Sequence, residues 1–202
     1  MSFAAFPSGP PDMGLPAAIA LLALGLVFGS IPTSLLVGRA VGIDVLRAGE
    51  GNPGAANVWR LAGARAGVVA LLLDMGRAIV PGLAGWAVAG YWGAVCGALG
   101  AEIGAVRPIL PGLRGGRGVG TAAGAGLVIA PVAGAIGFLV AIVVGVATRR
   151  PALATVAGFV AYPVAWIVLG VRSIDTLVPM AGIGLVALVA VARWAVTRPP
   201  RP

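Results

Sequence analysis

Long apolar stretches dominate this chain, and they restrict it to folds built from membrane-spanning helices. A helix needs about 20 apolar residues to cross a bilayer, and a lipid environment offers no partner to unpaired backbone groups. Five stretches are candidates by this criterion, at residues 15–41, 64–89, 90–106, 151–170 and 175–196. Only 10% of the residues are charged, whereas a soluble domain carries about 25%. We therefore predict an all-α integral membrane protein with a single membrane domain over residues 1–202.

One further apolar stretch, residues 118–148, is too long for one ordinary span and contains Pro131. Proline inside a helix removes a backbone hydrogen bond and clashes with the preceding turn. We therefore divide this stretch at Pro131 into two segments, the first of them short. The division predicts about seven membrane helices in total.

The arginines support this count and orient the chain. All 14 basic residues are arginine, and cytoplasmic loops are enriched in Lys and Arg. With the N-terminus outside and seven segments, every arginine except Arg77 and Arg172 falls on one side. This arrangement predicts an external tail at residues 1–14, cytoplasmic loops at 42–65 and 107–120, and a cytoplasmic tail at 197–202. Because topology accounts for the positive charge, we expect no nucleic-acid partner.

The scarcity of histidine and cysteine limits the chemistry that the chain can perform. The sequence contains no histidine, and its one cysteine is Cys96. These counts exclude a histidine general base, a metal site built from His and Cys ligands, and an intrachain disulfide.

The first predicted cytoplasmic loop is rich in glycine and asparagine and contains Gly49-Glu50-Gly51-Asn52-Pro53-Gly54. Its G-x-G-x-x-G pattern follows a membrane helix, whereas dinucleotide binding requires a strand at that place. Glycines permit a turn whose backbone N–H groups converge on an anion. Asn52 and Asn57 add amide donors, and Arg60 adds a forked cation suited to phosphate oxygens. An anion cradle and a simple tight turn both remain consistent with this loop.

The second loop contains Arg114-Gly115-Gly116-Arg117-Gly118. It places two guanidinium groups three residues apart on a flexible backbone, but it lacks the G-K-[ST] of a Walker A motif. Taken alone, it favours an anchor on the cytoplasmic side over an anion site. Two such loops on one membrane protein nevertheless indicate a phosphate-bearing substrate that is handled at the bilayer surface.

Charged residues within the apolar stretches are also informative. A charge at mid-bilayer costs about 2.5–3.5 kcal/mol, so intramembrane charges usually face a partner or a cavity. Asp74 and Arg77 lie three residues apart, a spacing that allows an ion pair on one helix face. We favour a structural pair at the edge of a site over a direct contact with substrate. For Glu102 we predict an interfacial salt bridge with Arg107.

Taken in order, these residues resemble a known family. The matching positions are Gly29-Ser30-Ile31-Pro32, Asp44, Gly49-x-Gly51-Asn52-x-Gly54-Ala55-x-Asn57-x-x-Arg60, Leu73-Asp74-x-x-Arg77, Pro108 and Arg114-Gly115-Gly116-Arg117-Gly118-Val119-x-Thr121. They are similar to the PlsY family, bacterial membrane acyltransferases that acylate glycerol 3-phosphate with acyl phosphate. The resemblance implies seven helices in the bacterial inner membrane and these two substrates. It also implies no metal, no cofactor and no acyl-CoA.

The same resemblance implies roles for individual residues. Both glycine loops would line a phosphate pocket on the cytoplasmic side, with Asn57, Arg60 and Arg117 as catalytic residues. The implied phosphate-binding residues are Gly49, Gly51, Asn52, Gly54, Arg114, Gly115 and Gly116. Ser30, Asp74 and Arg77 would support the site. Arg114 and Arg117 stand where the family has lysines, and a planar fork differs from a point charge in geometry.

The chain also departs from the family pattern at several polar positions. Glu50, Ala56 and Ala105 replace a serine, a threonine and a histidine, and the C-terminal HRxN motif is absent. A carboxylate inside an anion cradle is repulsive, so Glu50 must turn outward or pair with Arg47 or Arg60. We favour an acyltransferase for glycerol 3-phosphate. A catalytically degenerate relative that binds an anionic lipid or a membrane partner, and an acyltransferase with a different acceptor, remain open, as does the oligomeric state.

Overall fold

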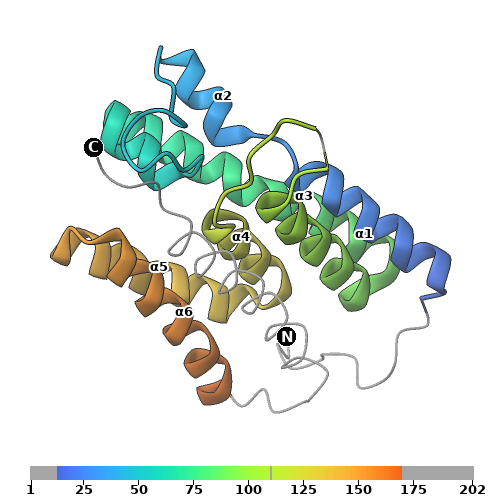
Figure 1. The fold of residues 1–202 in the computed structure, drawn as a ribbon. Helices are drawn as coiled ribbons and strands as arrows, with labels where there is room; N and C mark the ends of the chain where they lie inside the picture. The colour runs from blue at the N-terminus through green and yellow to red at the C-terminus, as the bar shows by residue number, and fades with distance from the viewer. Residues whose placement is uncertain (1–12, 110, 170–202) are drawn as a thin grey trace.

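The computed structural model describes residues 13–109 and 111–169, which form helices joined by loops (Figure 1). The helices are α1 (Leu15–Gly29), α2 (Thr33–Ala40), α3 (Ala55–Val106), α4 (Val119–Ile129), α5 (Pro131–Thr148) and α6 (Pro151–Val168). Three helical stretches are long and apolar enough to cross a membrane, namely Leu15–Ala40, Ala55–Val106 and Pro131–Thr148. The prediction of an all-α membrane fold is confirmed. The predicted span at 175–196, the tail at 197–202 and most of the tail at 1–14 lie outside the described residues.

Helix α3 is a bent element that contains two predicted spans. Its backbone leaves helical geometry at Gly63 and again at Ala89 and Gly90. At the second bend the chain turns back on itself. Gly85 and Gly93 approach each other closely, since a Cβ atom added to Gly85 would overlap the carbonyl group of Gly93. The middle arm of α3 (residues 64–89) and its last arm (residues 90–106) therefore pack in backbone contact. The predicted boundary between residues 64–89 and 90–106 is confirmed.

Two prolines mark helix boundaries, and one of them corrects a prediction. Helix α4 ends at Ile129 and α5 begins at Pro131, which confirms the division of that long stretch. The predicted span 15–41 is wrong as one continuous helix, because α1 ends at Gly29 and α2 begins at Thr33. Pro32 lacks a backbone N–H and cannot continue α1. The second half of the predicted loop 42–65 is also helical, since α3 begins at Ala55.

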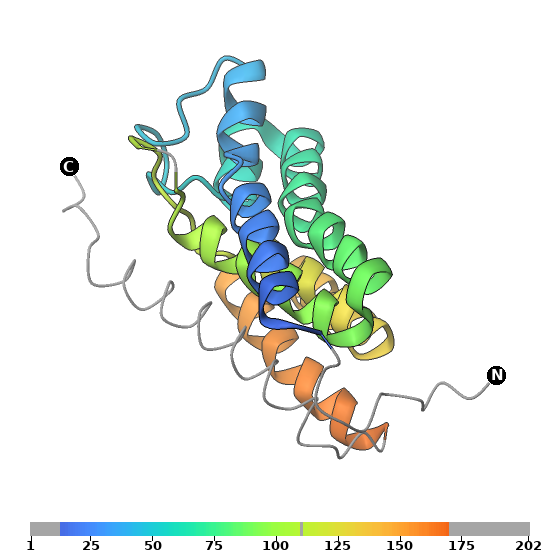
Figure 2. The same ribbon diagram turned by 90° about the vertical axis from the view of Figure 1, so that its right-hand side faces the viewer.

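Small residues bring α1 and α4 against α3. A Cβ atom added to Gly25 or Gly29 of α1 would overlap backbone atoms of Gly97 or Ala101 in the last arm of α3. Gly124 of α4 lies in the same way against the backbone of Met75 in the middle arm. Small residues at helix interfaces permit this close approach. The packing carries the loop after α2 and the loop before α4 to the same end of the molecule (Figure 2).

The intramembrane charges stabilise the break between α1 and α2. Arg77 Nη2 lies 3.0 Å from Asp74 Oδ1, so the predicted ion pair is confirmed. Arg77 also donates to the carbonyl oxygens of Gly29 (3.0 Å) and Ile31 (3.1 Å), which lie at the break between α1 and α2. The first two hydroxyl groups of α2 donate to the carboxylate of Asp74. The pair therefore satisfies the backbone and side-chain groups at both sides of the break.

Candidate active site

The two glycine loops meet at one end of the helices. The backbone N–H of Gly116 in the second loop donates to the carbonyl of Ala105 at 3.0 Å. A Cβ atom at Gly116 would lie 3.2 Å from the carbonyl oxygen of Pro53 in the first loop. Figure 2 shows the two loops side by side above the same helix ends. Residues far apart in the sequence are thus brought into one site.

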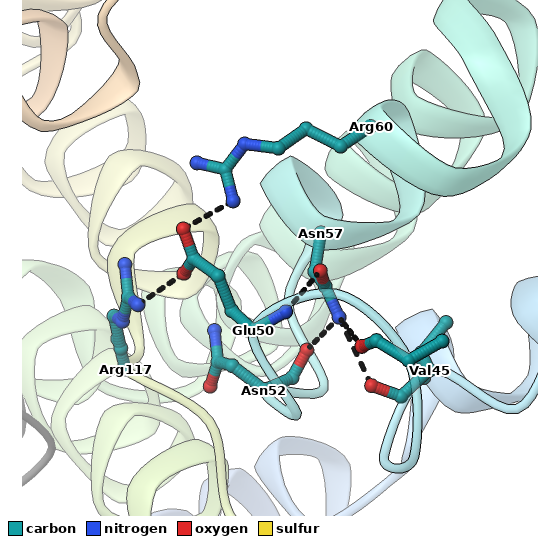
Figure 3. A network of polar contacts seen from close by, with 7 residues as sticks. Val45, Glu50, Asn52, Asn57, Arg60 and Arg117 are labelled. Carbon is teal, nitrogen blue, oxygen red and sulfur yellow. Dashed lines mark hydrogen bonds and ion pairs between the residues drawn. The ribbon is translucent and has the colours of Figure 1, made fainter. Parts of the chain in front are cut away.

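The side chain of Glu50 joins the two loops electrostatically (Figure 3). Its Oε1 accepts a hydrogen bond from Arg60 Nη1, and its Oε2 accepts one from Arg117 Nη2. The Glu50 side chain is 26% exposed, while the side chains of Arg60 and Arg117 are 39% and 20% exposed. The expected pairing of Glu50 with Arg60 is confirmed. The second pairing was not predicted, and Arg47 instead lies 3.5 Å from Asp44.

The side chain of Asn57 holds the backbone of the first loop by hydrogen bonds. Its Nδ2 donates to the carbonyl oxygens of Val45 (2.9 Å), Ala48 (3.2 Å) and Asn52 (3.2 Å). Its Oδ1 accepts the backbone N–H of Glu50 at 3.0 Å. The side chain is 1% exposed, so its amide is occupied with the loop. The geometry supports a positioning role for Asn57 in place of the predicted direct contact with phosphate.

Replacing Asn57 by Ala is expected to loosen this loop. The loop backbone groups that Asn57 holds would lose their partner, and a buried polar group without a partner costs about 1–3 kcal/mol. Water can enter part of the opened loop and reduces this cost. We expect the KM for the phosphate-bearing substrate to rise about tenfold, which is about 1.4 kcal/mol, with a smaller change in kcat. Steady-state kinetics of the purified protein in lipid measure both constants. An unchanged KM would contradict the positioning role.

The glycines on either side of Glu50 fix its direction. Gly49 and Gly51 both have a φ of 62°, a left-handed conformation that glycine adopts without steric cost. A Cβ atom at Gly49 would in addition overlap Asn57 Oδ1. In the second loop, a Cβ atom at Gly115 would overlap the carbonyl of Val106. The glycines of both loops therefore meet steric requirements of the backbone.

The remaining predicted site residues take different positions. Asn52 is buried, and Gly54 is the residue that immediately precedes α3. Arg114 is exposed, and within the described ranges it forms no ion pair or hydrogen bond with Glu50. Ser30 accepts the backbone N–H of Ile109 at 3.1 Å, which ties the end of α1 to the segment after α3. The supporting role of Ser30, Asp74 and Arg77 at the site stays a prediction.

The prediction for Glu102 is wrong. Its side chain is fully buried, and in the part of the chain that the structure describes it forms no salt bridge with Arg107 and no hydrogen bond. The carboxylate instead lies against Gly118, the residue immediately before α4, where a Cβ atom would overlap Glu102 Oε1. The N-terminal end of a helix carries a partial positive charge that favours a carboxylate. This contact depends on tertiary packing and has no signal in local sequence.

Comparisons with known proteins agree on one family. A family profile described as glycerol-3-phosphate acyltransferase matches residues 19–197. A glycerol-3-phosphate acyltransferase of Rubrobacter xylanophilus is 41% identical over 153 residues, which cover 75% of this chain and 77% of the relative. A protein of the same name from Anaeromyxobacter sp. strain Fw109-5 is 38% identical over 191 residues, with coverages of 86% and 87%.

Solved structures give the same result. A crystal structure of PlsY, an integral membrane glycerol 3-phosphate acyltransferase, in its glycerol 3-phosphate form matches with a TM-score of 0.78 and 26% identity. The match covers 92% of this chain and 96% of that chain. The lysophosphatidic acid form of PlsY matches with a TM-score of 0.77. With a profile match over most of its length and relatives near 40% identity, the chain belongs to the glycerol-3-phosphate acyltransferase family.

Proposed function

We propose that this protein transfers an acyl group from acyl phosphate to the hydroxyl of glycerol 3-phosphate, giving lysophosphatidic acid and phosphate for phospholipid synthesis. The names of its relatives support the reaction and the acceptor. The two PlsY structures were solved in forms named for that acceptor and for lysophosphatidic acid. The observation that carries the site is the convergence of Arg60 and Arg117, from two separate loops, on a single carboxylate.

The chemistry of the donor suits the groups in this site. In an acyl phosphate the carbonyl carbon is already activated, so the protein need not supply a nucleophile. The acceptor hydroxyl oxygen forms the new bond to the carbonyl carbon, and the bond between that carbon and the phosphate oxygen breaks. The departing phosphate keeps the electron pair, and a phosphate oxygen accepts the hydroxyl proton. This route requires no histidine, and the sequence contains none.

The protein contributes alignment and charge. Arg60 and Arg117 are catalytic residues in this proposal, because their planar guanidinium groups can each bind phosphate oxygens. They position the phosphate groups and offset the negative charge that accumulates when two anionic substrates meet. Asn57 and the glycines of both loops keep the cradle in shape. Arg114, which is exposed on the second loop, adds positive charge near the cradle.

The membrane provides the setting for the donor. The distribution of arginines supports a cytoplasmic location for the loops in a bacterial inner membrane, with the N-terminus outside. Apolar residues cover the outer faces of the helices, including Leu72 (59% exposed) and Leu139 (60% exposed). The acyl chain of the donor can then remain among lipids and helices while its phosphate reaches the loops.

A donor comparison tests the proposed function. Purified protein in lipid receives glycerol 3-phosphate with either palmitoyl phosphate or palmitoyl-CoA, and lysophosphatidic acid and phosphate are both quantified. We expect product only from palmitoyl phosphate, with one phosphate released per lysophosphatidic acid formed. Glycerol, which lacks the phosphate, serves as the control acceptor and should react far more slowly. Equal transfer from palmitoyl-CoA would contradict the donor, and equal transfer to glycerol would contradict recognition of the acceptor phosphate.

A further inference from the structure

The carboxylate of Glu50 occupies the place where a phosphate group would contact both arginines. Each of its oxygens accepts a hydrogen bond from a different guanidinium group, one on α3 and one on the second loop (Figure 3). Two oxygens of a phosphate could take the same two positions. We propose that Glu50 is an internal competitor for the phosphate site and thereby sets its affinity. The inference rests on the proposed function, since it names the group that the phosphate of a substrate displaces.

The charges at the site favour replacement of the Glu50 carboxylate by a bound phosphate. Arg60 and Arg117 together carry two positive charges, and Glu50 neutralises one of them. A phosphate monoester carries about −1.5 to −2 charges near neutral pH. If the carboxylate stayed in place beside a bound phosphate, two like charges would lie within a few ångströms and repel each other. Phosphate binding therefore favours a conformation in which Glu50 has left the arginines.

The local structure allows the side chain to move while the loop stays fixed. The backbone N–H of Glu50 is held by Asn57 Oδ1 at 3.0 Å, between two glycines with left-handed backbone. The Glu50 side chain is 26% exposed, so rotation about its own bonds can carry the carboxylate into solvent. Ion pairs at partly exposed positions are weak because water competes for them. A phosphate with two charges can consequently replace a carboxylate with one.

The size of the effect follows from simple competition. The apparent dissociation constant equals the intrinsic value divided by the fraction of molecules whose site is free. If Glu50 occupies the arginines in about nine of ten molecules, the apparent dissociation constant for phosphate rises about tenfold. Removing the carboxylate should restore the intrinsic affinity.

Binding of inorganic phosphate to the full-length protein in lipid nanodiscs, measured by titration calorimetry, tests the proposal. Glu50→Gln keeps the shape of the side chain and removes its charge, and Glu50→Ser removes most of the side chain. We expect both variants to bind inorganic phosphate about tenfold more tightly than the parent protein. Asp44→Asn is the matched control, because it removes the same charge from the same loop but from a carboxylate that pairs with Arg47. It should change the affinity by less than about twofold.

The outcomes separate this proposal from the proposed function. Unchanged or weaker phosphate binding in Glu50→Gln would overturn it and make Glu50 part of the binding site. Equal tightening in Asp44→Asn would also overturn it, because a general change in charge would then explain the result. Phosphate titration requires no turnover, so it tests whether Glu50 competes with phosphate even if the protein transfers no acyl group. A parent protein that binds phosphate but transfers no acyl group would count against the proposed function alone.

Discussion

Replacing Arg117 by Ala is expected to lower kcat/KM for acyl transfer to glycerol 3-phosphate by about 100-fold, or about 2.7 kcal/mol. Arg117 supplies one of the two guanidinium groups that converge on the anion position. A hydrogen bond to a charged group contributes about 1.5–3 kcal/mol. Because the side chain is 20% exposed, truncation opens a space that water can enter, and the protein should still fold.

The matched control for this variant is Arg47→Ala. Arg47 also lies in the region of the glycine loops, but its side chain is 90% exposed and pairs with Asp44. This control should change kcat/KM by less than about threefold, since exposed ion pairs contribute little. Initial rates of phosphate release, with size-exclusion profiles to verify folding, provide the comparison. A folded Arg117→Ala protein with nearly the parent rate would contradict the assignment of the site.

Replacing Asp74 by Ala is expected to destabilise the folded protein by about 3–5 kcal/mol, because it removes one partner of a buried ion pair. The side chains of Asp74 and Arg77 are only 6% and 11% exposed. The change leaves Arg77 without its counter-ion. It also removes the acceptor for the hydroxyl groups of Thr33 and Ser34 at the start of α2.

Unfolding by SDS titration of the protein in mild detergent, followed by circular dichroism, measures this effect. Asp44→Ala is the control, since that side chain is 56% exposed and its loss should cost no more than about 1 kcal/mol. Asp74→Asn should fall between the parent and Asp74→Ala, because the amide oxygen can still accept one hydroxyl. A parent-like midpoint for Asp74→Ala would show that the pair does not stabilise the break.

Much of the fold was predictable because membrane helices follow local rules. Apolar length identified the spans 64–89 and 90–106, and Pro131 identified the boundary between α4 and α5. The break at Pro32 was missed although that proline was visible. The apolar stretch continues through it, and the pair that stabilises the break lies more than 40 residues further along the chain.

The site was predictable in its components but not in its assembly. Glycine and arginine spacing identified both loops, and family resemblance selected Arg60 and Arg117. Nothing local in the sequence indicates that Glu50 and Arg117, 67 residues apart, form an ion pair. Asn57 was singled out from the sequence, but its hydrogen bonds to the loop carbonyls depend on how the loop folds over it. Long-range contacts of this kind arise from the packing of α1 and α4 against α3.

We propose that the two loops form one phosphate site around Arg60 and Arg117, with Glu50 in the place of the ligand. The most direct test is an experimental structure of this protein in lipid with bound glycerol 3-phosphate. We predict that the phosphate oxygens lie within hydrogen-bond distance of both guanidinium groups and that the carboxylate of Glu50 has turned away. A phosphate bound elsewhere, with Glu50 still joined to both arginines, would contradict the claim.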